Sequence, residues 1–182
     1  MLSETATHLL TLEWRTLRLI SSSGEILTMA ATTPEARFAQ RVRLALQKHG
    51  CAVERIENRV NLGIPDMLVG IGGQFVLLEL KALTRGLAVS LRPHQIAFMT
   101  RHGREGRRCF VLVHDAGSSK RPPSVSLYAG TQALELAELG LRAAPVMSWH
   151  ASAVDWIQLV GLLSAGFNPS KKSIGRDEPP PA

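Results

Sequence analysis

Residues 63–81 read GIPDMLVGIGGQFVLLELK, and this stretch decides the fold. Two apolar runs, 67–71 and 74–81, flank Gly72-Gly73, a glycine pair that suits the tight turn of a two-stranded hairpin. In an antiparallel hairpin, the start of the first strand lies beside the end of the second. The sequence therefore predicts that Asp66 lies next to Glu79 and Lys81.

Side-chain alternation along the second strand predicts a chemical site at this end of the hairpin. Glu79 and Lys81 should point to one face of the strand, and Leu80 to the other. Two neighbouring carboxylates repel, and a divalent cation resolves that repulsion. Mg²⁺ favours carboxylate oxygens and keeps several waters, which leaves positions for a phosphate oxygen and an attacking water. From the residues alone, an ordinary ion pair at a strand edge is the alternative.

The hairpin is flanked by segments that complete an α/β domain. Thr33 to His49 has a capping residue, Pro34 at the first helical position and apolar residues at helical spacing, so we expect a helix that Gly50 ends. Partial alternation over Cys51 to Val60 predicts a weak strand or an irregular segment. After the hairpin, the patterns predict a helix over 92–103 and a strand over 108–113.

The remaining segments are predicted as follows. We expect a strand over 124–128, a helix over 131–139 and a helix over 154–163 that packs through Trp156, Ile157, Leu159, Val160 and Leu163. Residues 1–31 form an N-terminal extension in which 9–20 favours a short helix or strand. The domain spans 32–166, and the Pro-, Lys- and Ser-rich residues 167–182 form a flexible tail.

Composition and charge point to a folded protein with a polyanionic partner. The chain has 182 residues, which suits one domain, and 45% of them are hydrophobic. Its formal net charge is +6, which favours nucleic acid, although a modest positive balance also serves solubility alone. Cys51 and Cys109 are too far apart for a zinc knuckle, and we expect buried thiols. No stretch reaches the roughly 18 apolar residues of a membrane span, and we expect a cytoplasmic protein.

These motifs resemble a known family. Gly63-Ile64-Pro65-Asp66, followed by Glu79-Leu80-Lys81 and a downstream Gln95, is similar to the signature of the PD-(D/E)XK nuclease superfamily. Within it, the resemblance is to the VRR-NUC group and to Holliday junction resolvase-like enzymes of phages and archaea. It covers residues 35–115. It implies a restriction-endonuclease-like core of order αβββαβ, a mixed central sheet flanked by helices, if 52–59 is the first strand.

The resemblance also implies roles for individual residues. Asp66 and Glu79 become metal ligands for Mg²⁺, for which Mn²⁺ substitutes, and Lys81 becomes the catalytic lysine. Such families often have a Gln near this lysine, which matches Gln95, and an acidic residue from the first helix, which matches Glu35. A partner for the helix dipole is the rival interpretation of Glu35. Glu54 and Glu57 are further acidic residues whose direction the pattern leaves open.

The implied function is cleavage of branched DNA by a homodimeric, magnesium-dependent endonuclease. The predicted DNA-binding residues are Arg85, Arg92, His94 and Arg101, with Arg104, Arg107 and Arg108 nearby in the sequence; such residues neutralise backbone phosphates without reading bases. A restriction- or repair-type endonuclease on the same core, a DNA-binding module without cleavage and a chance coincidence of motifs are the alternatives.

Overall fold

The computed structural model describes residues 18–20, 26–28, 33–56 and 63–165, and it divides into two compact units, Met1–Thr33 and Pro34–Ala182. In the first unit, β1 (Arg18–Ile20) pairs antiparallel with β2 (Ile26–Thr28). The predictions for residues 9–17 and for the tail 167–182 fall outside the described residues.

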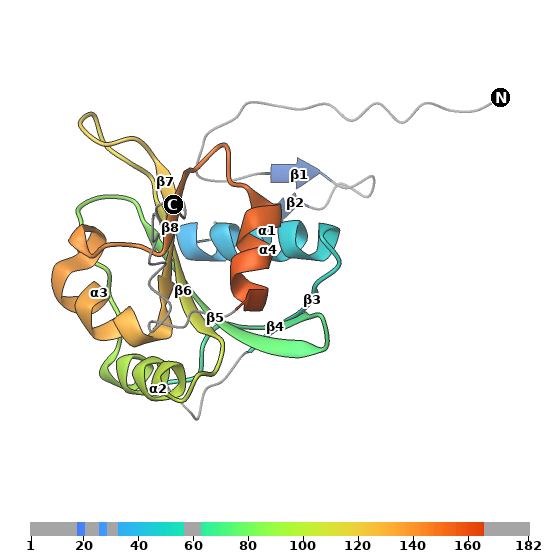
Figure 1. Ribbon diagram of the computed structural model, residues 1–182. Helices are drawn as coiled ribbons and strands as arrows, with labels where there is room; N and C mark the ends of the chain where they lie inside the picture. The colour runs from blue at the N-terminus through green and yellow to red at the C-terminus, as the bar shows by residue number, and fades with distance from the viewer. Residues whose placement is uncertain (1–17, 21–25, 29–32, 57–62, 166–182) are drawn as a thin grey trace, which may run out of the picture. The chain divides into compact units, whose positions relative to one another are not determined.

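A six-stranded mixed sheet forms the centre of the second unit (Figure 1). Its order follows the sequence: β3 (Ala52–Arg55), β4 (Met67–Ile71), β5 (Gln74–Leu83), β6 (Cys109–Asp115), β7 (Ser124–Ala129) and β8 (Met147–His150). All neighbours pair antiparallel except β5 and β6, which are parallel. A parallel pair needs a long crossover, and the chain between β5 and β6 supplies one that contains a helix.

The predicted hairpin is β4 and β5. Gly72 and Gly73 both have positive φ angles, 55° and 77°, which two-residue hairpin turns require and which glycine adopts without strain. The register pairs Met67 with Leu78, so Asp66, the residue before Met67, falls beside Glu79. The hairpin and its register are therefore confirmed.

Helices cover both faces of the sheet (Figure 1). The helices are α1 (Pro34–Lys48), α2 (Pro93–Arg104), α3 (Ala133–Leu139) and α4 (Trp156–Ala165), with single 3₁₀ turns η1 (Gly130–Gln132) and η2 (Gly140–Arg142) on either side of α3. One core cluster joins α1 and α4 to the sheet, and the other joins α2 and α3 to its opposite face. The order α1, β3, β4, β5, α2, β6 confirms the expected αβββαβ core.

The two core clusters divide the side chains of β5 by parity. Leu78 and Leu80 belong to the cluster with α1 and α4, whereas Leu77 and Leu83 belong to the cluster with α2 and α3. A central strand with helices on both faces buries successive residues, which explains its continuous apolar run. The odd-numbered face, which carries Glu79 and Lys81, is therefore the face that α2 covers.

Three features of the C-terminal part differ from the sequence prediction. β8 was not expected: it is a four-residue edge strand, and it forms because β7 offers a free edge, with Leu127 opposite Met147. The last helix begins at Trp156 and not at 154, because Oδ1 of Asp155 accepts a hydrogen bond from the backbone N–H of Gln158 and caps the first turn. Ile157, predicted to pack, is 73% exposed; this prediction was wrong.

Two smaller expectations concern the cysteines and membrane spans. Cys51 and Cys109 are both free and buried, as expected. In the part of the chain that the structure describes, no helix has the length and apolar character to cross a bilayer.

Candidate active site

Asp66 is held at the entrance to β4 by backbone hydrogen bonds on both sides. Its Oδ2 accepts the N–H of Leu80 at 2.8 Å, and its carbonyl oxygen accepts the N–H of Ile56 at 2.9 Å. The preceding turn lies against α2, because a Cβ on Gly63 would come within 2.7 Å of the carbonyl oxygen of His94. A glycine at position 63 thus lets the Asp66 loop approach the first turn of α2.

Glu79 and Lys81 point to the same side of β5, as alternation predicts. Nζ of Lys81 lies 2.7 Å from Oε1 of Glu79. The Glu79 residue is 0% exposed, and the Lys81 side chain is 16% exposed. The pair is therefore an ion pair withdrawn from water, unlike the solvated strand-edge pair that was the alternative from the residues alone.

Gln95 joins the same carboxylate from α2. Its Nε2 donates to Oε1 of Glu79 at 2.5 Å, and its Oε1 accepts the backbone N–H of Arg92 at 3.0 Å. Because the Arg92 N–H needs an acceptor, the amide oxygen must face it, and the NH₂ group then faces Glu79. Capping of α2 therefore fixes the orientation of Gln95 toward the site.

One oxygen of Glu79 is left without a partner. Oε1 takes both donors, Lys81 and Gln95, while Oε2 is buried and accepts no hydrogen bond within the described part of the chain. A buried carboxylate oxygen that is stripped of water and unpaired is costly. Asp66 lies close enough to raise the pKa of Glu79 by its charge. The unpaired oxygen and the second carboxylate are the donor set that a hard cation prefers.

Burial and charge shift the pKa values of the pair. Burial, reinforced by the charge of Asp66, raises the pKa of Glu79 from 4.5 to about 7, although Lys81 opposes the rise. Burial works to lower the pKa of Lys81, but the charge and hydrogen bond of Glu79, together with Glu35 and Asp66, outweigh it and raise the pKa. The Lys81 ammonium is therefore charged at neutral pH. Glu79 gains and loses a proton near neutral pH unless a bound cation takes the place of that proton.

Glu35 reaches the rim of the site from the first turn of α1. Its Oε1 lies 3.7 Å from Nζ of Lys81, and its side chain is 49% exposed. Over the described residues, no group of three or more His, Cys, Asp or Glu side chains is arranged to hold a metal ion. The structure therefore does not bring the predicted trio of Glu35, Asp66 and Glu79 together as a three-ligand metal site, although Asp66 lies close enough to Glu79 for its charge to act on that carboxylate.

The other predicted acidic and basic residues differ in exposure and in contacts. Glu54 is exposed on β3, and Glu57 lies outside the described residues. All four predicted DNA-binding residues are exposed: Arg85, Arg92, His94 and Arg101. Three arginines contact neighbouring residues: Arg101 lies 3.3 Å from Nε2 of His102, Arg107 contacts His102 and Glu105, and Arg108 donates to the carbonyl oxygen of Ser164 at 2.8 Å.

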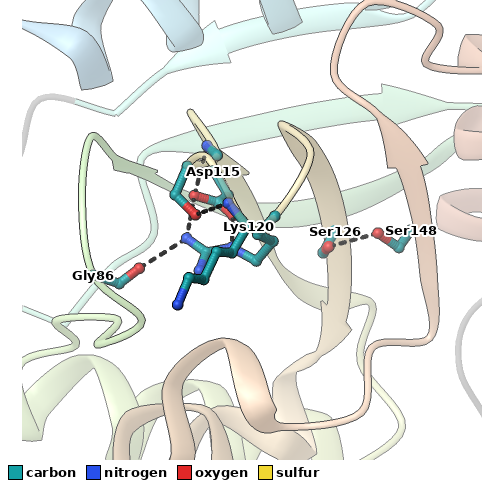
Figure 2. Close-up of polar contacts among 8 residues, drawn as sticks. Gly86, Asp115, Lys120, Ser126 and Ser148 are labelled. Atoms are coloured by element: carbon teal, nitrogen blue, oxygen red, sulfur yellow. Dashed lines mark hydrogen bonds and ion pairs between the residues drawn. The ribbon is translucent and has the colours of Figure 1, made fainter.

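Sequence reasoning missed a second ion pair at the same end of the sheet. Asp115, at the end of β6, is 1% exposed, and the guanidinium of Arg121 binds both its oxygens (Figure 2). Register places Asp115 beside Leu83, two residues beyond Lys81 on the neighbouring strand. The signal available was a carboxylate that follows an apolar run and His114 at the end of the strand, and that precedes a Gly-Ser-Ser turn and an arginine.

No family model matches the chain, and no curated protein sequence matches it. Among solved structures, the chain is similar to Archaeoglobus fulgidus Hjc, a Holliday junction resolvase from an archaeal hyperthermophile. The two share 18% sequence identity with a TM-score of 0.41, over 53% of this chain and 77% of that chain. At these values the resolvase's activity and substrate do not transfer to this chain.

Proposed function

We propose that this chain is a magnesium-dependent endonuclease that hydrolyses phosphodiester bonds of DNA. One observation carries the proposal: Glu79 is fully buried, Lys81 and Gln95 bind its Oε1, and its Oε2 has no partner among the described residues. A purely structural ion pair would satisfy both oxygens, whereas a catalytic carboxylate keeps one for a ligand.

The donor set fits Mg²⁺ better than a metal that requires a closed protein cage. Mg²⁺ is commonly held by one or two carboxylates, with waters and a substrate phosphate completing the shell. Asp66 and Glu79 would hold it, with Glu35 as a candidate third ligand, and Mn²⁺ would substitute. The bound ion would supply Lewis acidity and lower the pKa of a coordinated water.

Lys81 and Gln95 have distinct tasks in this proposal. The Lys81 ammonium, charged at neutral pH because Glu79 and the other carboxylates raise its pKa, donates to a phosphate oxygen and stabilises charge that develops there. Gln95 contacts Glu79 and fixes the rotamer of that carboxylate, so that Oε2 keeps its direction. Both side chains already hold these positions in the structure without DNA, so binding of DNA does not need to rearrange them.

The proposed substrate is DNA, bound through its backbone. Arg85, Arg92, His94 and Arg101 are exposed, follow Lys81 along the chain, and suit phosphates, which carry no base identity. The formal charge of +6 adds a field that attracts a polyanion. From the motif resemblance, we propose a preference for branched DNA and a homodimer, since two symmetric cuts across a junction need two sites.

The test is a cleavage assay with purified protein. Labelled four-way junction, flap, single-stranded and linear duplex DNA are each incubated with Mg²⁺, with Ca²⁺ and with chelator. Cleavage in Mg²⁺ alone, strongest on the four-way junction, is expected. Cutting of linear duplex at one sequence would support a restriction-type enzyme, and binding without any cleavage would leave a DNA-binding module.

A further inference from the structure

The chain between β5 and α2 connects the two halves of the candidate site. Residues 84–92 link the strand that carries Lys81 to the helix that carries Gln95, without regular secondary structure. Arg85 and Arg92 are exposed near the two ends of this linking segment, while Val89 and Leu91 are buried. The path of the linking segment therefore determines where its two cations stand relative to the site.

The backbone at the start of the linking segment is fixed by donors from the C-terminal half of the chain. The Ala116 N–H donates to the carbonyl oxygen of Leu83 at 2.9 Å, and the Leu141 N–H donates to that of Leu87 at 2.8 Å. At Gly140, where φ is 60°, a Cβ would overlap the Leu87 carbonyl oxygen, so only glycine permits this approach. Residues after β6 thus hold the last residue of β5, where the linking segment starts, and Leu87 within the segment.

The third anchor is a side chain. Nη2 of Arg121 donates to the carbonyl oxygen of Gly86 at 3.0 Å (Figure 2). Gly86 is the residue that follows Arg85 in the chain. The same guanidinium is itself fixed, because its Nε lies 2.5 Å from Oδ2 of Asp115 and its Nη2 lies 3.0 Å from Oδ1. The Gly117 N–H also donates to Oδ1 of Asp115 at 3.0 Å. A buried carboxylate therefore orients an arginine that in turn orients one peptide of the linking segment.

The arginines of this region are of two kinds, one bound to other protein groups and one exposed. Arg121 is committed to Asp115 and Gly86, with 31% of its side chain exposed. Arg85 is exposed, and within the described residues its guanidinium has no hydrogen bond or ion pair. A fixed backbone at Gly86 reduces the number of directions that Arg85 samples, which lowers the entropy lost when it binds a phosphate.

We infer that Asp115 and Arg121 form a positioning pair that holds the linking segment, so that Arg85 and Arg92 meet backbone phosphates of the strand that is cut. The inference rests on the proposed nuclease function and deepens it by giving the region after β6 a role in substrate binding. Arg121 is a positioning residue, because it acts through Gly86 and the neighbouring Arg85.

The first test compares two neighbouring cations in the full chain. Arg121→Ala and Lys120→Ala each remove one positive charge, but over the described residues only Arg121 contacts both Asp115 and Gly86. Affinity for labelled four-way DNA is measured by anisotropy in Ca²⁺. Arg121→Ala should weaken binding at least about fivefold, the lower end of typical coupling between sites, and Lys120→Ala should weaken it less. Equal losses would overturn the inference.

Arg121→Lys separates geometry from charge. An ammonium retains the positive charge but lacks the planar fork that binds Asp115 and Gly86 together. The inference therefore predicts that Arg121→Lys binds DNA like Arg121→Ala. Wild-type affinity in this variant would show that charge alone matters, and would overturn the positioning role.

A double-mutant cycle tests whether Arg121 acts through Arg85. If it does, Arg121→Ala should cost much less affinity in an Arg85→Ala background than in the wild-type chain. Losses that multiply would overturn the inference, because a general loss of structure would weaken both backgrounds equally. Each variant is checked by thermal unfolding, so that folding and binding are read separately.

Hydrogen exchange provides a readout that needs no DNA. Backbone amides of residues 84–92 should exchange faster in Arg121→Ala than in wild type or Lys120→Ala, while those of β5 and β6 stay unchanged. Unchanged exchange in residues 84–92 would overturn the inference even if the wild-type protein cuts DNA. A wild-type protein that neither binds nor cuts DNA would refute the proposed function instead, whatever the exchange shows.

Discussion

The ammonium of Lys81 lies 2.7 Å from Oε1 of Glu79, two residues earlier on the same strand. Gln95 donates to that same oxygen from α2, so two donors converge on one side of a single carboxylate. The other oxygen of Glu79, Oε2, is buried and unpaired within the described residues. Burial and the charge of Asp66 together raise the pKa of this carboxylate. This asymmetry assigns different tasks to the residues around Glu79, which substitutions can separate.

Lys81→Ala should abolish cleavage and keep metal binding. An ammonium has no lone pair to give a cation, so removing it leaves the carboxylates in place. Titration calorimetry with Mn²⁺ measures the affinity, which should match or exceed that of wild type because a neighbouring positive charge is gone. Loss of metal affinity in a folded Lys81→Ala protein would instead make Lys81 a support for the carboxylates.

The raised pKa of Glu79 predicts how stability depends on pH. The group titrates at 4.5 when unperturbed and at about 7 in the folded chain, so between these values the folded state binds more protons than the unfolded state. Stability therefore falls as pH rises through this window. Glu79→Gln, which resembles the protonated form, should be more stable than metal-free wild type at pH 8, by on the order of 3 kcal/mol.

The control for this prediction is the same comparison below the window. At about pH 4, where Glu79 is protonated in both states, wild type and Glu79→Gln should have similar free energies of unfolding. Addition of Mg²⁺ at pH 8 should stabilise wild type and leave Glu79→Gln nearly unchanged. A variant less stable than wild type at pH 8 without metal would contradict the account.

Gln95→Leu should lower the rate of cleavage by roughly 10²-fold, the effect of a misplaced catalytic group. Leucine retains the volume but removes the donor to Glu79 and the acceptor for Arg92. Because α2 loses a cap, thermal unfolding is measured alongside single-turnover cleavage. Gln132→Leu is a matched control, since Gln132 similarly accepts the N–H of Ala129 but lies outside the site. Equal rates in the two variants would leave Gln95 with a capping role only.

DNA affinity should fall steeply with salt and depend little on sequence. A protein that contacts several phosphates releases counterions, and the slope of log affinity against log salt reports their number. Arg85→Ala and Arg92→Ala should each reduce this slope by about one. Arg43→Ala is the control, because the Arg43 guanidinium contacts Gln40 on α1, and this variant should leave the slope unchanged. Anisotropy in Ca²⁺ over a salt series measures the slopes, and a flat series for wild type would contradict phosphate binding.

The sequence was sufficient for the hairpin because local rules coincide there. Gly72-Gly73 fixes the turn, alternation fixes which side chains share a face, and the pairing of Met67 with Leu78 follows from both. That Gln95 lies near Lys81 was expected from the family resemblance alone, and its hydrogen bond to Glu79 was not predicted. Its cause, the cap that Gln95 forms on the Arg92 N–H, is visible only once the crossover is in place.

What the sequence did not predict depends on contacts between distant segments. β8 is short and half-exposed, and it is a strand because β7 has a free edge. Ile157 fits a helical apolar pattern but is 73% exposed, because α4 packs into the core through Leu159 and Leu163 instead. The hydrogen bond from Arg121 to Gly86 joins residues 35 positions apart. The spacing of apolar residues in the sequence does not predict such a contact.

Single-turnover cleavage by wild type, Asp66→Asn and Glu79→Gln, with and without Mg²⁺, tests the central claim most directly. Both substitutions replace a carboxylate by an amide of the same shape, and the asparagine side chain in Asp66→Asn retains an acceptor for the Leu80 N–H, so folding is largely preserved. Glu138→Gln, an exposed carboxylate on α3, is the control. We predict cleavage by wild type and Glu138→Gln in Mg²⁺, and a loss of at least roughly 10²-fold in the two site variants. Cleavage by folded Asp66→Asn or Glu79→Gln at the wild-type rate would contradict the account.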